Sequence, residues 1–211
     1  MTQKSYPLSS PQREIWLDQM FYPDIPLYNL GYYVRIDGKI NTAIFEKAIN
    51  KFIKNNDVLR TVLCKENTIS TQKFLKTTNF QLDFQDFSNK SNPHQDTTEW
   101  IKQELIKPFK THDSLLFKFV LYKASDECYY WSIKYYHLII DNWGVSLTIQ
   151  RVANIYNSLL NKQYNEDCDS YLNFIKDDVK YLSSKKFTKH QEYWKNKFCK
   201  TAYITRDLLK Q

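Results

Sequence analysis

The chain has 211 residues and a net charge of +7, and 42% of its residues are hydrophobic and 16% aromatic. This composition can fill a sizeable core and argues against a wholly disordered chain. With only 3 glycines and neither a G-x-G-x-x-G pattern nor a P-loop, nucleotide binding through such loops is disfavoured. No apolar run of about 18 residues could span a bilayer, and no signal peptide opens the chain.

The positive charge suits nucleic acid, a membrane surface or an acidic protein partner, but a lysine-rich solvated surface is the simpler explanation. The densest basic stretch comprises Lys185, Lys186, Lys189, Lys195, Lys197 and Lys200. The aromatic residues that interrupt it are typical of an amphipathic helix with a core-facing side: Phe187, Tyr193, Trp194 and Phe198. No base-reading motif accompanies this stretch, so nucleic acid is not an expected partner.

The cysteines are scattered through the chain and form no C-x-x-C pair, so a zinc site is disfavoured. They are Cys64, Cys128, Cys168 and Cys199. Four free thiols are typical of a reducing compartment, so we expect the protein to be cytoplasmic.

The first predicted element is a helix near the N-terminus. Ser9 and Gln12 match a capping box, and Pro11 suits the first helical turn. Pro23 and Pro26 end this helix.

Strand and helix patterns then follow one another. Residues 32–36 are a β-branched and aromatic run that predicts a strand. Apolar residues from 44 to 53 recur at helical spacing and predict an amphipathic helix. Further strands are predicted over residues 58–63, 69–75 and 80–84.

A loop over residues 88–93 precedes the next predicted helix. Asp96 and Glu99 match a second capping box at its start, and Pro108 ends it.

Two strongly apolar strands come next, over residues 115–123 and 128–139, with a turn at 126–127. In the second strand, alternate residues from Tyr129 to Ile139 share one face, and His137 is among them. Helices are predicted over three further ranges: 146–160, 171–182 and 186–197. The mixture without strict alternation predicts one compact unit of the α+β class, or a mixed α/β sandwich.

The candidate chemical group is one of four histidines. His94, His112 and His190 lie in polar or charged segments and read as surface residues. His137 ends the apolar strand, and Asp141 follows it in the turn to the next helix. The imidazole could exchange protons at neutral pH, but spacing alone favours a structural histidine.

Asp141 also has a structural interpretation, because it could cap the following helix. No G-x-S-x-G elbow, Ser-His-Asp arrangement or carboxylate pair stands out.

Three motifs in order resemble the condensation domains of nonribosomal peptide synthetases. Residues 8–12 with Trp16 resemble Leu-(Ser/Thr)-x-Ala-Gln-x-x-x-Trp, with Pro11 in place of Ala. Residues 55–63 resemble Arg-His-Glu-x-Leu-Arg-Thr-x-Phe, with the Leu-Arg-Thr part intact. Residues 136–143 resemble His-His-x-x-x-Asp-Gly-Trp. Weaker matches flank the third motif: residues 108–109, 116–117, 129–131, 170–174 and 193–194.

This resemblance implies a chloramphenicol acetyltransferase-like lobe, an α/β (α+β) sandwich with a mixed sheet flanked by helices. Residues 1–211 would be the N-terminal lobe of a two-lobed domain whose C-terminal lobe is absent from this chain. The family joins a carrier-bound acyl or peptidyl thioester to a carrier-bound amino acid through an amide bond. The lobe alone is expected to fold but to be inactive.

The implied partners are acyl or peptidyl carrier domains, an adenylation domain of the same synthetase, and the missing lobe. The substrates are tethered to the carriers by phosphopantetheine, so no cofactor or metal is expected on this chain. A basic surface would steer acidic carrier domains. If Met1 is the natural start, the domain would receive a donor from a separate protein, or a fatty acyl group as a starter domain.

The resemblance also implies roles for individual residues. His137 would be a general base or a positioning group. Tyr136 replaces the motif's first histidine and would pack on the opposite strand face. Asn142 replaces the motif glycine, and a backbone N–H near it could help hold the oxyanion.

The remaining residues of the active-site loop would be structural. Asp141 would pair with an arginine that many members carry in the second lobe. Trp143 would pack under the loop, and Gly144 belongs to the same loop. Arg60, from the second motif, would also be structural.

Four alternatives remain open. The replacements at 136 and 142 fit a non-catalytic module that recruits partners. The chain length fits a stand-alone trimeric acyltransferase, although that family places its histidine near the C-terminus. An epimerisation domain normally follows a carrier domain, and a heterocyclisation domain would carry Asp at position 136.

Overall fold

The structure is a computed structural model that describes residues 4–65, 70–161 and 169–198. The chain separates into two compact units, Met1–Tyr171 and Leu172–Gln211. The prediction of a single compact unit is therefore wrong. Hydrophobic spacing shows which side of a helix is apolar, but it does not show what that side packs against.

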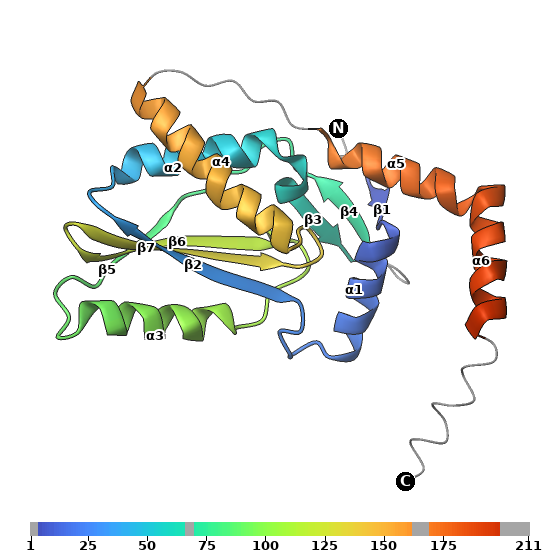
Figure 1. The fold of residues 1–211 in the computed structure, drawn as a ribbon, viewed down its shortest axis with the longest axis horizontal. Coiled ribbons are helices and arrows are strands. Elements are labelled where there is room, and N and C mark those ends of the chain that lie inside the picture. The colour runs from blue at the N-terminus through green and yellow to red at the C-terminus, as the bar shows by residue number, and fades with distance from the viewer. Residues whose placement is uncertain (1–3, 66–69, 162–168, 199–211) are drawn as a thin grey trace, which may run out of the picture. The chain divides into compact units, whose positions relative to one another are not determined.

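The first unit is built on a mixed four-stranded sheet in the order β2-β7-β6-β5 (Figure 1). Its strands are β2 (Asn29–Asp37), β5 (Asp83–Asp86), β6 (Phe117–Ser125) and β7 (Cys128–Tyr136). All neighbours are antiparallel except β5 and β6, which are parallel. The predicted turn at 126–127 joins β6 to β7.

Helices cover both faces of this sheet. Helices α2 (Thr42–Asn55) and α4 (Asn142–Asn161) lie over one face, and α3 (Pro93–Leu105) lies over the other (Figure 1). Every residue of β7 is buried because it is a central strand with both faces covered. The architecture confirms the prediction of a mixed sheet flanked by helices.

The alternation predicted for β7 is confirmed as far as Tyr135. Trp131 and Tyr135 belong to the larger core with α2 and α4, whereas Cys128 and Tyr130 pack with Ile101 of α3. The two faces of one strand thus contribute to two separate cores.

A second sheet of three antiparallel strands, in the order β1-β4-β3, completes the first unit. Its strands are β1 (Tyr6–Pro7), β3 (Thr61–Cys64) and β4 (Thr71–Phe74). Ile69, the first residue of the strand predicted over 69–75, lies outside the described residues. Helix α1 (Ser10–Phe21) begins after Ser9, whose backbone N–H donates to Gln12 Oε1 over 3.0 Å, as a capping box requires.

Three of the wrongly predicted element boundaries lie between residues 57 and 105. The strand expected over 58–63 begins with a 3₁₀ turn, η1 (Asp57–Arg60), and only its end is extended. The strand expected over 80–84 starts at Asp83, because Phe80 and Leu82 pack against the core before pairing begins.

The third error is at α3, which begins at Pro93 after Asn92, so that Asp96 lies in the first turn and no capping box forms there. Proline at the first helical position loses no intrahelical hydrogen bond, which explains the earlier start. The helix ends at Leu105, before Pro108.

The second unit contains α6 (Lys185–Phe198) and most of α5 (Tyr171–Leu182), close to the predicted ranges. No residue of α6 is buried, so the expected core-facing aromatic side is not covered within the described residues. Trp194 and Phe198 instead stack on each other, with ring centroids 5.4 Å apart. Lys200 lies outside the described residues.

No helix in the described part of the chain is both long and apolar enough to cross a membrane.

Candidate active site

The candidate site is the loop that links β7 to α4, and residues 136–144 are called the site loop below. The sequence predicts a strand as far as Ile139, but β7 ends at Tyr136. The N–H of Ile139 donates to the carbonyl of Tyr136 over 3.1 Å, which closes a tight turn and takes the chain out of the sheet. His137 therefore lies in a turn instead of on a strand face.

The backbone of His137 is held by the segment that leads into β2. Its N–H donates to the carbonyl of Tyr28 over 2.8 Å, one step beyond the pairing of Asn29 with Tyr136. The imidazole is half-buried and meets the Tyr28 ring edge-on, with centroids 6.4 Å apart. Within the described residues neither ring nitrogen has a hydrogen-bond partner, so both are free to act on a ligand.

Asp141 caps α4. Its Oδ1 accepts from the N–H of Gly144 over 2.8 Å, and its carbonyl accepts from the N–H of Val145 over 3.0 Å. This is the geometry of an N-cap residue. Among the described residues Asp141 forms no ion pair with an arginine.

Asn142 is the first residue of α4, so this helix starts four residues earlier than predicted. The only described non-glycine residue with positive φ is Asp113, so Asn142 needs no left-handed backbone. Its Oδ1 accepts from the hydroxyl of Tyr32 over 2.9 Å. An asparagine can thus stand in place of the motif glycine without backbone strain.

Trp143 is 72% exposed, so the prediction that it packs under the loop is wrong for this chain. It occupies the second position of α4, next to Asn142, where the side chain projects away from the helix axis into solvent. The indole is instead an apolar surface group beside the candidate site.

Tyr136 is 1% exposed and lies against Phe109, with ring centroids 6.2 Å apart. Its hydroxyl has no hydrogen-bond partner among the described residues. Burial raises the pKa of this phenol well above its ordinary value. Tyr136 is therefore packed in the core and does not share the surface of His137.

Arg60 lies apart from the site loop. Its guanidinium donates to the carbonyls of Leu75 and Ile53, each over 2.9 Å, and to that of Lys54 over 2.6 Å. Two of these carbonyls belong to the last turn of α2, where backbone acceptors lack intrahelical partners. Arg60 thus ties the end of α2 to the segment after β4.

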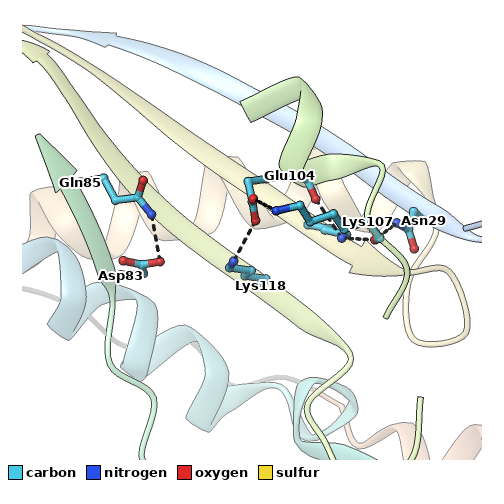
Figure 2. A network of polar contacts seen from close by, with 7 residues as sticks. Asn29, Asp83, Gln85, Glu104, Lys107 and Lys118 are labelled. Atoms are coloured by element: carbon cyan, nitrogen blue, oxygen red, sulfur yellow. Dashed lines mark hydrogen bonds and ion pairs between the residues drawn. The ribbon is translucent and has the colours of Figure 1, made fainter. Parts of the chain in front are cut away.

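On the α3 side of the sheet, a polar network joins β2 and β7 to the end of α3 (Figure 2). The Asn29 side chain donates to the carbonyls of Leu105, over 3.0 Å, and of Lys107, over 2.8 Å. The buried Lys134 donates to the carbonyls of Glu104 and Lys107. These bonds connect both strands, next to the site loop, to the end of α3.

The remaining histidines lie away from His137. The Nδ1 of His94 is 3.2 Å from the Tyr130 hydroxyl on the α3 side of the sheet, and His112 Nε2 is 2.9 Å from Ser70 Oγ. His190 bonds to Tyr181 in the second unit.

Neither the cysteines nor the acidic residues build a further site within the described part. Cys64 and Cys128 are free thiols there, whereas Cys168 and Cys199 lie outside the described residues. No group of three or more His, Cys, Asp or Glu residues could hold a metal ion in the described ranges.

Two of the cavities in the described part of the chain flank α4. One of about 140 Å³ borders the site loop at Ile140 and Gly144 and also has Asn56 and Arg151 in its lining. The other, of about 220 Å³, lies between β2, α2 and α4 and has Trp131 in its lining. His137 lines neither of them.

Sequence reasoning did not single out Tyr28 or Tyr32 as site residues. Both contact the site loop although more than 100 residues separate them from it in the sequence. Their segment predicts only a strand and the residues that precede it. The signal that the sequence offers is the group of tyrosines in and just before the predicted strand, Tyr28, Tyr32 and Tyr33.

The comparisons with known proteins show the family of this chain. The family model for the condensation domain matches residues 2–211. A dimodular nonribosomal peptide synthase from Bacillus subtilis (strain 168) is 30% identical over 195 residues, which is 92% of this chain and 8% of that protein. An isonitrile lipopeptide synthase from Streptomyces coeruleorubidus is 26% identical over 91% of this chain and 13% of its own length.

Solved structures match as well. A mutant of the starter condensation domain of rhizomide synthetase RzmA, in complex with C8-CoA, is 29% identical with a TM-score of 0.85, over 93% of this chain and 46% of that one. The first condensation domain of the calcium-dependent antibiotic synthetase shares the fold, with a TM-score of 0.81 at 17% identity and coverage of 94% of this chain and 50% of that one.

The chain thus spans about half of each solved domain and a small part of the multidomain synthetases. With a family model that matches nearly its whole length and a histidine turn held as described above, this chain belongs to the condensation-domain family.

Proposed function

We propose that this chain is the N-terminal lobe of a condensation domain that forms an amide bond between an acyl thioester donor and an amino acid acceptor. The observation that carries this proposal is the environment of His137. Its backbone is fixed by the carbonyl of Tyr28, and its two ring nitrogens have no partner among the described residues. An imidazole held in this way is ready to act on a substrate.

The chemistry needs a neutral amine, and an α-amino group has a pKa of about 7.7–8.0, so most of it is protonated at neutral pH. His137 would accept the proton that the amine loses, or would orient the amine for attack. As the C–N bond forms, the C–S bond of the thioester breaks and the thiol leaves with a proton. No metal or redox step is required.

The oxyanion of the tetrahedral intermediate needs hydrogen-bond donors. The carboxylate and carbonyl of Asp141 engage the N–H groups of Gly144 and Val145. The first two N–H groups of α4, those of Asn142 and Trp143, have no acceptor among the described residues. These two groups are the proposed donors.

The two departures from the family motif do not argue for a recruiting module. Tyr136 is buried away from the surface that His137 occupies, and Asn142 takes its place without backbone strain.

Asp141 and Arg60 would act as structural residues through the bonds described above. Trp143 and Gly144 would shape the entrance and the backbone of the site loop.

A starter role is supported by the likeness to the RzmA starter domain, whose structures include complexes with C8-CoA and Leu-SNAC. An acyl-CoA or a carrier-bound fatty acyl thioester is therefore the proposed donor. A second lobe would supply the other wall of the site. Carrier domains and an adenylation domain would be the partners, and the scattered cysteines favour the cytoplasm.

The test is amide formation by the gene's full-length product, followed by mass spectrometry with a panel of acyl-CoA donors and Leu-SNAC or a loaded carrier as acceptor. His137→Ala should abolish the product. The control is His94→Ala, an exposed histidine on the α3 side of the sheet, which should retain activity.

A folded wild-type protein that yields no amide with any donor, while it still binds carriers, would contradict the proposal and favour recruitment. Equal activity of the wild type and His137→Ala would remove His137 from the mechanism.

A further inference from the structure

The segment between α1 and β2 contributes to the surroundings of His137 although it contains no family motif. Tyr28 touches His137 twice, through its backbone carbonyl and through its ring. Since β7 has already ended, the bond from the His137 N–H to the Tyr28 carbonyl is the last link between this residue and the sheet.

The imidazole lacks the restraint that usually sets the orientation of a functional histidine. In most such sites one ring nitrogen is hydrogen-bonded to a carboxylate or a carbonyl, and this bond fixes the ring. His137 has no such bond within the described residues. It does meet the Tyr28 ring edge-on, at an interplanar angle of 76°.

The Tyr28 ring is itself anchored. Its hydroxyl donates to Asp18 Oδ2 on α1 over 2.7 Å, which is the length of a charge-assisted hydrogen bond. The same bond raises the pKa of Tyr28, and a phenol keeps its proton at neutral pH, so the hydroxyl remains a donor. Because the hydroxyl points to Asp18, it is not available to transfer a proton to the substrate.

Asn29, the residue after Tyr28, is held by the end of α3. Asn29 donates to the carbonyls of Leu105 and Lys107 at the end of α3 (Figure 2). The backbone at residues 28–29 is thus held by α3 and by β7, and the remaining freedom is rotation of the Tyr28 side chain. The bond to Asp18 restricts that rotation.

We propose that Tyr28 is a positioning residue for His137 and that Asp18 acts through the Tyr28 hydroxyl to hold the imidazole in one orientation. This inference rests on the proposed function for its catalytic consequence. The physical contact between the two rings can be tested separately.

The kinetic test uses the full-length protein with Tyr28→Phe, Asp18→Asn and the double variant. Each single change should lower kcat about fivefold and leave KM within about twofold, because a slightly misplaced catalytic group slows the chemical step. The double variant should be no slower than either single variant, since both changes break one bond. Tyr28→Leu, which also removes the ring contact, should lower kcat by about fiftyfold or more.

Matched controls come from the same segment. Tyr22→Phe and Asp24→Asn alter exposed residues of the α1–β2 connection and should leave kcat unchanged. A rise in KM without a fall in kcat, or multiplied effects in the double variant, would overturn the proposal.

The second test needs no activity. Diethyl pyrocarbonate modifies accessible imidazoles, and peptide mapping by mass spectrometry follows each histidine separately. Loss of the ring contact in Tyr28→Leu should raise the modification rate of His137 at least about twofold, with Tyr28→Phe between this variant and the wild type. His112 and His190 serve as internal references.

An unchanged rate at His137 in both Tyr28 variants would refute the positioning role. If the modification rate of His137 changes in the Tyr28 variants but the protein forms no amide, the ring contact is supported and the proposed function fails.

Discussion

Lys134 offers a test of the polar network beneath the site, because its charge is buried. The residue is 6% exposed, its Nζ donates to two carbonyls at the end of α3, and it lies 4.8 Å from the centroid of the Phe109 ring. Burial, with smaller contributions from the nearby Lys118 and Lys107, lowers the pKa of Lys134 from 10.5 to about 8.

The sign of the effect follows from proton linkage. Between about pH 8 and pH 10 the unfolded chain keeps the proton on Lys134 and the folded chain has lost it, so stability contributed by this group rises with pH. Below about pH 7 both states are protonated and the contribution is flat. The lowered pKa corresponds to about 3 kcal/mol in total, of which about 2 kcal/mol is gained between pH 7 and pH 9.5.

The perturbation is Lys134→Met, which keeps most of the side-chain volume and removes the titrating group. The difference in unfolding free energy between wild type and variant, measured by urea denaturation, should shift by about 2 kcal/mol in favour of the wild type from pH 7 to pH 9.5. Groups common to both proteins cancel in this difference. Lys65→Met, at an exposed position, should show no comparable shift.

A difference that stays constant with pH would refute the reasoning. It would mean that Lys134 titrates alike in the folded and unfolded chains and therefore reaches water in solution.

Two further substitutions address the site loop, and a third addresses the start of α2. Gly144→Ala should destabilise the fold by about 1–3 kcal/mol and lower activity, because the new Cβ would lie 2.4 Å from Ile140 Cγ1; a thermal melt unchanged from the wild type would contradict this. Tyr136→Phe should stabilise the fold by about 1 kcal/mol, because it removes a buried hydroxyl that has no hydrogen-bond partner among the described residues. A melting temperature below that of the wild type would show that the hydroxyl is hydrogen-bonded in solution. Asn41→Ala should lower the unfolding free energy measured by urea denaturation by about 1 kcal/mol, because Asn41 Oδ1 accepts from the N–H of Ile44 and caps α2. An unchanged unfolding free energy would show that other interactions stabilise the start of α2.

Much of the fold could be predicted because local signals and tertiary packing agree. The amphipathic pattern of α2 and the alternating pattern of β7 are each produced by the core that they face. Element ends were less predictable. The strand β7 was expected to reach Ile139, because Leu138 and Ile139 are apolar, but they are buried in a turn where burial no longer implies pairing.

The candidate site was predictable only in part. His137 and Asp141 stand out because the site loop carries a family motif and because a carboxylate before a helix suits an N-cap. The motif predicts that Trp143 packs under the loop, but the residue is exposed, since an aromatic residue next to a motif does not reveal which surface covers it. Tyr28 and Asp18 could not be connected to His137 at all, because the contact joins α1, the start of β2 and the end of β7.

The sequence by itself determined the family, the helices and strands of the core, and the identity of the central histidine, because periodicity and motifs are local properties of the chain. Only the tertiary structure decided that β7 stops at Tyr136 and that Asn142 needs no unusual backbone. It also decided that the ring of Tyr28, from a distant segment, lies edge-on to the His137 imidazole. These features depend on which backbone groups form hydrogen bonds with distant parts of the chain. Tertiary packing determines these partners, and local sequence patterns do not specify them.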